Sequence, residues 1–222
     1  MLPGRSISVS ALSFLLVGFS LFAACTNAPV MEPQAVAPSL PSHFTTYTAD
    51  SGVFSISYPS DWEVPMDLIA EMKEATVDLF QPDITPELAE AVRKANMVFV
   101  AGAKTESGYN PNVNVTVQVT EHTSGSLDKL IDISEQEFRQ SVRDFQEVSR
   151  TKAIVDGHDA LIVEFQYAVP AASSLCHSLL MTVRAKRSMW FVTCTVLPPL
   201  EFGDVADDFS AVLQSLRLDD AA

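Results

Sequence analysis

The sequence predicts an α+β fold, in which strands and helices build one domain. Several segments have the two-residue hydrophobic period of half-buried strands, most clearly 53–58. Four others have the three-to-four-residue spacing of amphipathic helices, at about 66–80, 86–95, 126–145 and 198–216. The strands of the second half follow one another through short turns, which favours antiparallel pairing. With 222 residues, 47% of them hydrophobic, the chain can supply one core and an N-terminal appendage.

The appendage begins with residues 1–24, which have the pattern of a signal peptide. Arg5 is the only charged residue among the first 31, and 7–24 is almost continuously apolar. Three interpretations of this segment are open. The run is nearly as long as the ~20 apolar residues of a transmembrane helix, so a retained anchor is one. A secreted protein cut after Ala24 is the second, and it would begin with a free, exposed thiol at Cys25.

The third interpretation, which the residues favour, is a bacterial lipobox. The stretch Leu21-Phe22-Ala23-Ala24-Cys25 resembles one, because two small residues and an apolar run stand before a cysteine. Phe22 departs from the pattern, since Leu is usual there. We therefore predict a lipoprotein whose Cys25 carries the lipid, with palmitate among its acyl chains. It would be anchored outside the cytoplasm, in the cell membrane or the outer membrane. Thr26 stands where an Asp retains many such proteins in the inner membrane, which favours the outer one.

Residues 25–42 are predicted to be a tether, because they are rich in proline, alanine and small polar residues. The prolines are Pro29, Pro33, Pro38 and Pro41. Proline favours an extended chain of ~3 Å per residue, so this segment separates the domain from the bilayer. The predicted folded domain spans 43–218.

The charge of the chain bounds its partners. Removal of 1–24 takes away Arg5 and no other charged residue, which changes the net charge from −14 to −15. Such a surface is repelled by phosphate groups, so nucleic acid is not expected as a partner, and contact with the lipid bilayer comes through the Cys25 lipid anchor. Solubility is the simplest interpretation of this acidity. The alternative is a preference for basic partners or divalent cations.

The first predicted strand, 53–59, places three large side chains on one face and ends at Pro59, which cannot donate to a sheet ladder. Trp62 then returns to the core. The next segment, 65–96, predicts two short helices. Pro82 stops the first of them, and Thr85 caps the second.

Two strands are predicted at 97–103 and 113–120, and the second alternates valines with Asn, Thr and Gln. Between them, 106–112 is interpreted as a loop with one exposed aromatic residue, Tyr109. A helix follows, capped by Ser126 and running to about residue 145.

The rest of the chain is predicted to be a meander closed by a helix. The strands are expected at 147–155, 160–169, 175–185 and 189–196. The stretch Asp156-Gly157-His158-Asp159 is a tight hairpin turn, in which Gly157 can take a positive φ. Pro198 and Pro199 open the last helix, which ends near Leu216.

Three of these motifs resemble PsbP-like domains, the family of extrinsic photosystem II subunits and their bacterial relatives. They are the strand that closes on Tyr58-Pro59 and re-enters through Trp62, the turn at 156–159 with its apolar strand, and the Cys194-Thr195 strand before the last helix. The resemblance covers 43–218. It implies an antiparallel sheet of about six strands sandwiched between helices, with 65–96 as a helical insertion. It also implies an accessory role on protein complexes.

Hydrophobic alternation predicts the register of the last hairpin. With Lys186 and Arg187 as its turn, Leu179 faces Cys194 on a buried face. Cys176 then lies on the opposite face, outside the ~4–7 Å Cα separation that a disulfide needs. We therefore predict a buried structural thiol at Cys194 and no disulfide.

The sequence offers no set of residues that predicts catalysis, a cofactor or a metal site. The nucleophile elbow, the P-loop, the dinucleotide-binding turn and the zinc-binding helix motif are all missing from it. The carboxylates of 156–159 and 204–208 suit a turn and a helix N-terminus. Solvated surface positions are expected for His158 and His177. The histidines lack metal-ligand spacing, so any metal site would have to be assembled by the fold. They are His43, His122, His158 and His177.

We therefore expect a membrane-anchored, non-enzymatic binding or assembly module of the cell envelope, held by the Cys25 lipid and associated with a membrane protein complex. Two alternatives remain open. One is a carrier of a small molecule or a divalent cation, with a cleft between the inserted helices and the sheet. The other is an envelope enzyme without a recognisable motif.

Overall fold

A computed structural model describes residues 40–79, 84–106, 108–119, 126–141, 143–169 and 174–219. The predicted signal peptide, Cys25 and most of the tether lie outside the described residues. Within them, no helix is both long and apolar enough to cross a bilayer. The regular elements run from Phe44 to Leu218.

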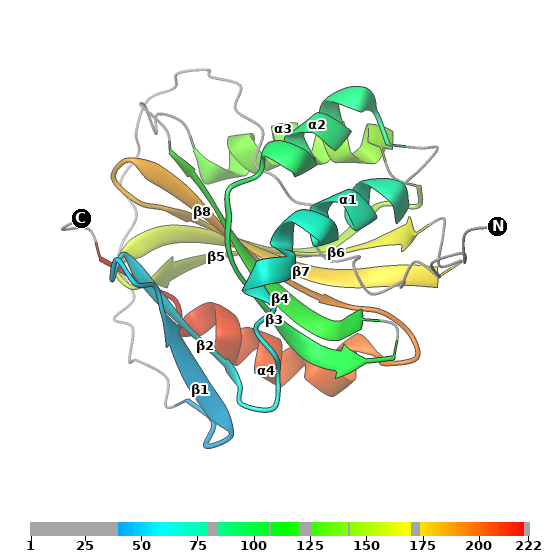
Figure 1. Cartoon of the computed structure of the whole chain (residues 1–222). Helices are drawn as coiled ribbons and strands as arrows, with labels where there is room; N and C mark the ends of the chain where they lie inside the picture. The colour runs from blue at the N-terminus through cyan, green and yellow to red at the C-terminus, as the bar shows by residue number, and fades with distance from the viewer. Residues whose placement is uncertain are drawn as a thin grey trace.

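The centre of the domain is a six-stranded antiparallel sheet (Figure 1). Its strand order is β3-β4-β8-β7-β6-β5. The prediction of an antiparallel sheet of about six strands, flanked by helices, is confirmed. The strands are β3 (Met97–Thr105), β4 (Gly108–Val119), β5 (Gln146–Val155), β6 (His158–Val169), β7 (Ser174–Arg184) and β8 (Ser188–Val196).

A second, three-stranded sheet was not predicted. It has the order β1-β2-β9 and consists of β1 (Phe44–Thr48), β2 (Phe54–Pro59) and β9 (Arg217–Leu218). The strand that ends at Pro59 therefore belongs to this small sheet and not to the large one. A backbone bridge connects the two parts, because Glu63 and Gly102 exchange hydrogen bonds of 2.9 and 3.0 Å. A Cβ at Gly102 would lie 2.8 Å from the Asn112 Cβ, which explains the glycine there.

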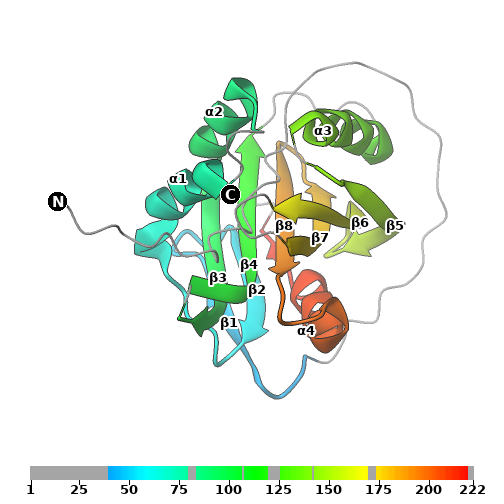
Figure 2. The ribbon, with the colours of Figure 1, turned by 90° about the vertical axis from the view of Figure 1, so that its right-hand side faces the viewer.

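Helices cover both faces of the large sheet (Figures 1 and 2). One face carries α1 (Ile69–Leu79, preceded by a 3-10 turn at Met66–Leu68), α2 (Pro86–Lys94) and α3 (Leu127–Ser141). The other face carries α4 (Phe202–Gln214) and the small sheet. Each side has its own core. Val77, Val92 and Leu180 belong to the first core, and Phe54, Phe209 and Cys194 belong to the second.

The hairpin registers follow the sequence patterns. In β7 and β8, Leu179 pairs with Cys194, Met181 with Val192 and Val183 with Trp190, so the predicted register is confirmed. The turn between β5 and β6 is also confirmed, with Asp156 and Gly157 at φ values of 51° and 81°. Two consecutive residues with positive φ form the type of turn whose twist matches that of a hairpin.

Three predicted boundaries are wrong. The helix expected to run to about residue 145 ends at Ser141, and β5 begins at Gln146. The segment 106–112 is not a loop, because β4 begins at Gly108 and Tyr109 pairs with Lys104 in the β3–β4 ladder. Tyr109 is half-buried, and its hydroxyl donates to Glu63 Oε2 at 3.3 Å. The last helix begins at Phe202 rather than at Pro198, because Glu201 is its N-cap and forms a capping box with the third helical residue.

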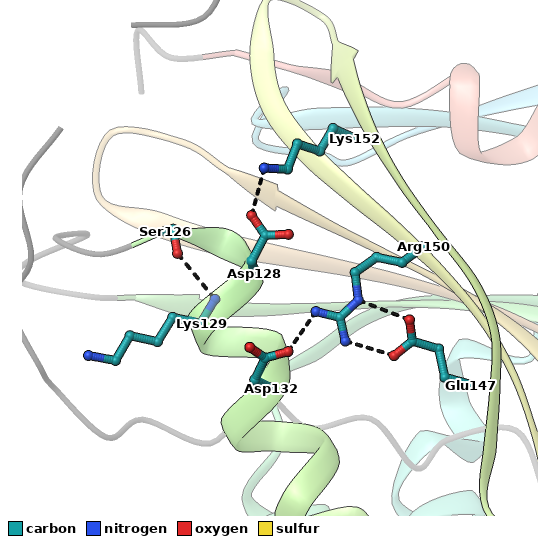
Figure 3. Close-up of polar contacts among 7 residues, drawn as sticks. All are labelled: Ser126, Asp128, Lys129, Asp132, Glu147, Arg150 and Lys152. Atoms are coloured by element: carbon teal, nitrogen blue, oxygen red, sulfur yellow. Dashed lines mark hydrogen bonds and ion pairs between the residues drawn. The ribbon is translucent and has the colours of Figure 1, made fainter. Parts of the chain in front are cut away.

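Helix α3 is fixed to the sheet at its first turns by charged pairs (Figure 3). Arg150 on β5 donates to Asp132 Oδ1 at 2.7 Å and makes a two-pronged contact with Glu147 at 2.7 and 3.1 Å. Lys152 lies 2.8 Å from Asp128. Ser126 caps the helix as predicted, because its hydroxyl accepts from the Lys129 amide at 3.2 Å. These contacts lie between elements of the domain, so we assign them to stability.

Candidate functional site

The most unusual feature of the interior is a buried polar surface on the face of the large sheet that α1 and α2 cover. We call it the polar floor. All of its members are 5% exposed or less. They are Asn112, Asn114 and Thr116 on β4, Thr193 and Thr195 on β8, and Ser178 and Thr182 on β7.

The strand registers place these side chains next to one another. Asn112 pairs with Thr195, and Thr195 pairs in turn with Ser178. Asn114 pairs with Thr193 in the next row. Residues directly opposite in an antiparallel pair point to the same face, so the side chains form one continuous surface.

The flanking residues show which face this is. Asn114 is paired with Thr193 on one side and with Val100 of β3 on the other, and Val100 packs with Met72 of α1. Thr193 is in turn paired with Leu180 of β7, which belongs to the core that contains Val77 of α1. The alternate residues of the same strands face α4 instead and are apolar. The polar floor therefore lies between the central strands and the helices at 66–94.

Part of the polar floor is satisfied by internal hydrogen bonds. The Ser178 and Thr195 hydroxyls lie 2.9 Å apart, and the Asn112 amide donates to the Tyr109 carbonyl at 3.0 Å. The Thr193 and Thr182 hydroxyls are buried and have no hydrogen-bond partner among the described residues. A buried polar group left without a partner costs roughly 1–3 kcal/mol of stability, so these two positions call for an explanation.

The helices above the polar floor are tied to each other. Lys73 of α1 donates to the Ala95 and Arg93 carbonyls at the end of α2. Arg93 also forms a two-pronged contact with Glu74 at 3.0 and 3.1 Å. Burial lowers the pKa of the Lys73 amine. These contacts make α1 and α2 one unit, and Met72 and Val77 of α1 give this unit apolar contacts to the sheet.

From the sequence, β4 was predicted to be a strand that alternates valines with polar residues. Burial of the polar side chains was not predicted. The structure buries both faces of this strand. Val113 and Val115 pack toward α4, and the asparagines lie under the inserted helices, whereas Val119 at the end of the strand is 79% exposed. The signal that could have revealed this was Thr193 and Thr195 on β8, because polar residues repeat there with the same period.

At one end the polar floor continues into a buried thiol. The Cys176 thiol lies 3.6 Å from the Ser178 hydroxyl and is hydrogen-bonded to the Tyr167 hydroxyl. Burial raises the pKa of Cys176 to about 12, and it also raises the pKa of Cys194 on the opposite face. Both cysteines are free and buried, with Cys194 where the sequence placed it.

We expect both thiols to be inert in the folded protein, because a raised pKa leaves almost no reactive thiolate at pH 8. In a Cys25→Ala variant, a thiol reagent should react with neither cysteine under native conditions. Two thiols should react after unfolding without reductant. Rapid modification of the native protein would contradict the burial, and a missing thiol after unfolding would indicate a disulfide.

A second polar cluster lies on the α4 side of the large sheet. His177 Nε2 and Glu164 Oε1 are 2.8 Å apart, and Gln166 Nε2 lies 3.2 Å from His177 Nδ1. The His177 ring stacks on Phe202, with 3.9 Å between the ring centroids. His177 is only 18% exposed, so its predicted solvated position is wrong. The cluster joins β6, β7 and the first turn of α4.

This cluster does not have the arrangement of a hydrolytic triad. Ser149 donates to the second oxygen of Glu164 at 3.1 Å, so the carboxylate stands between the hydroxyl and the His177 imidazole. Activation of a serine requires its hydroxyl to be hydrogen-bonded to one nitrogen of the imidazole, while the carboxylate is hydrogen-bonded to the other nitrogen. The observed order suits a structural hydrogen-bond chain.

The other residues considered at the sequence level lie apart from one another. His43 Nε2 and Asp208 Oδ1 are 3.1 Å apart at the surface. His158 is half-buried at the start of β6, and His122 and Cys25 lie outside the described residues. Asp156 accepts from the Leu218 amide at 2.8 Å, which ties the hairpin turn to β9. Among the described residues, no three His, Cys, Asp or Glu side chains are placed to hold one metal ion.

Comparison with known proteins identifies the fold. No family model and no curated protein matches the sequence. The solution structure of cyanobacterial PsbP (CyanoP) from Synechocystis sp. PCC 6803 superposes with a TM-score of 0.52 at 12% identity, over 86% of this chain and 98% of that one. LpqN of Mycobacterium tuberculosis, described as involved in cell envelope biogenesis, gives a TM-score of 0.49 at 10% identity, over 80% and 92%. The strand pairing, the helices on both sheet faces and the likeness to CyanoP together show that this domain has a PsbP-like fold.

Proposed function

We propose that this protein is a lipid-anchored, non-enzymatic binding or assembly module of the cell envelope. The observation that carries the proposal is the polar floor under α1 and α2. Its side chains are amides and hydroxyls with no general base among them, and such a surface is suited to binding rather than to bond making. The arrangement of Ser149, Glu164 and His177 supports the same conclusion. The serine hydroxyl is hydrogen-bonded to the Glu164 carboxylate and not to the His177 imidazole that would have to take its proton.

The proposed anchor is the lipid on Cys25. Residues 26–42 would separate the acidic domain from the headgroups, and the net charge of −15 after cleavage disfavours direct contact with anionic lipids. A domain held in this way meets partners that lie in or near the same membrane. The accessory role that the PsbP resemblance implies fits this position.

The test is an affinity purification of the native, lipidated protein from its own membranes in a mild detergent, with a Cys25→Ala variant as the matched control. The native protein should fractionate with membranes and bring down a stoichiometric partner, whereas the variant should be soluble and should lose that partner. A membrane-bound Cys25→Ala protein would contradict the lipid anchor. A native protein that purifies alone would contradict the assembly role.

A second candidate function is the binding of a small molecule, and the position of the polar floor between the insertion and the sheet favours it. Divalent cations suit this surface poorly, because they prefer carboxylate oxygens and the polar floor has only amides and hydroxyls. An envelope enzyme is the third candidate. A hydrolase screen with the purified protein tests it. Turnover that survives Ser149→Ala would show that Ser149 is not the nucleophile and that the reaction takes place elsewhere in the protein.

A further inference from the structure

We propose that the outer edge of β1 is a docking surface for the tether, and that residues 36–40 add to it as a fourth strand of the small sheet. Leu40 is the first described residue of the tether. The proposal goes beyond the assembly role and does not depend on the lipid at Cys25. It names the segment that covers β1 and the register in which that segment binds.

The outer edge of β1 carries backbone groups that β2 does not use. β1 is the outside strand of the small sheet (Figure 1). The Ala49 amide, just after β1, donates to the Phe54 carbonyl of β2 at 3.1 Å. Antiparallel strands bond through alternate residues, so the odd-numbered residues of β1 face β2. The amides of Thr46 and Thr48 therefore point outward, where they have no backbone acceptor among the described residues.

The sequence of β1 lacks the features that protect an exposed strand edge. It is Phe-Thr-Thr-Tyr-Thr, without a charge or a proline, and its three threonines are exposed. By contrast β5, an outer strand of the large sheet, carries Arg150 and Lys152. Charged residues and prolines discourage pairing at an edge, whereas an uncharged edge invites it. β1 is therefore the edge at which a covering strand is expected.

The chain enters the domain on this same side of β1. The Phe44 amide, which also points outward, donates to the Pro41 carbonyl at 3.1 Å. This bond closes a turn over Ser42 and His43 that reverses the chain, and His43 lies 3.1 Å from Asp208 of α4. The residues before the turn are thereby directed back along β1, antiparallel to it. A segment joined this closely has an effective concentration of roughly millimolar, which favours it over a second copy of the chain.

The turn sets the register of the added strand, and a proline in the tether fits that register. With Pro41 opposite Phe44, Ser39 falls opposite Thr46 and can exchange hydrogen bonds with it. Pro38 precedes Ser39, so its missing N–H would point away from β1. A shift of one residue would turn this proline toward the ladder and remove a hydrogen bond.

Hydrophobic alternation in the tether matches the same register. Tyr47 of β1 points to the large sheet and packs against Phe99, with 4.8 Å between the ring centroids. Residues directly opposite in an antiparallel pair share a face. The alanine and the serine at 37 and 39 would therefore join the exposed threonines at 46 and 48. Three apolar residues would cover the half-buried tyrosine instead: Val36, Pro38 and Leu40.

The added strand changes the length of the tether and the point where it leaves the domain. The free segment becomes 25–35 instead of 25–42, so its reach falls from about 54 Å to about 33 Å at ~3 Å per residue. The tether then leaves the domain beside the turn between β1 and β2, and no longer at His43.

The test is hydrogen exchange of single backbone amides in the native protein, purified in a mild detergent. The Thr46 and Thr48 amides should exchange at least about tenfold more slowly than in an unstructured chain. Ser39→Pro removes the amide that faces β1 and should abolish this protection. The Thr45 and Tyr47 amides, which face β2, should stay protected in both proteins and show that the domain is folded.

Val36→Pro is the matched control, because the amide of residue 36 points away from β1 in the proposed register. This variant should keep the protection of Thr46 within about twofold of the native value. Unprotected Thr46 and Thr48 amides in the native protein, or equal protection in the native protein and Ser39→Pro, would overturn the proposal. Protection that survives Ser39→Pro and rises with protein concentration would also overturn it, and would assign the edge to a second copy.

Discussion

Replacement of Phe209 by alanine is expected to remove about 3–5 kcal/mol from the free energy of unfolding, the typical cost of a cavity left by a buried phenylalanine. Phe209 has no exposed surface and lies in the core that α4 shares with the small sheet and one face of the large sheet. A domain of this size has a total stability of only ~5–15 kcal/mol. The variant should therefore unfold at a much lower urea concentration than the native protein.

The effect of Phe209→Ala has a matched comparison in the same helix. Phe202 is partly exposed, and its centroid lies 6.1 Å from that of Phe209, so Phe202→Ala changes the same residue type with less buried area. We expect this second variant to lose about 1–2 kcal/mol. Equal losses in the two variants, measured by urea titration with similar slopes, would mean that α4 does not seal the core as the structure shows.

Phe209 also illustrates what the sequence could predict. Val205, Phe209 and Val212 recur at helical spacing, and all three are buried against the sheet. The β7–β8 register was equally accessible, because one buried face of alternating apolar residues fixes the pairing. In both cases the signal is periodic, and periodicity reports directly on which side chains share a face.

The small sheet and the polar floor were less accessible, for different physical reasons. Strand β1 has the sequence Phe-Thr-Thr-Tyr-Thr, and β9 has only two residues, so neither carries a hydrophobic run of its own. They form strands because each pairs with β2 through antiparallel backbone hydrogen bonds. The alternation in β4 revealed two faces but not that both are covered, since the cover of the asparagine face comes from residues at 66–94. Period alone does not determine burial when another element supplies the lid.

Asn110 carries the second large prediction. It is 9% exposed near the start of β4, and its side chain makes two hydrogen bonds to the backbone of Leu197. Its amide donates to the Leu197 carbonyl at 2.8 Å, and its oxygen accepts from the Leu197 amide at 2.9 Å. The carboxamide thus replaces a backbone partner just beyond the end of β8, where the chain turns toward α4. Asn110→Ala would leave both buried groups of Leu197 unpaired, so we expect a loss of about 2–4 kcal/mol.

Two further variants separate this effect from a general sensitivity to substitution. Asn96→Ala removes an exposed side chain and should change the stability by less than about 0.5 kcal/mol.

Asn110→Asp keeps the shape of the side chain but should make the stability depend on pH. A protonated carboxyl can donate to the Leu197 carbonyl as the amide does, whereas an ionised one faces that carbonyl with a negative charge. The pKa of the new carboxyl is therefore higher in the folded state than its unfolded value of ~3.9, and the stability of the variant falls as the pH rises through it. Urea titrations that gave Asn110→Asp the same stability at about pH 4 and pH 7, relative to the native protein at each pH, would show that the two hydrogen bonds do not hold Leu197.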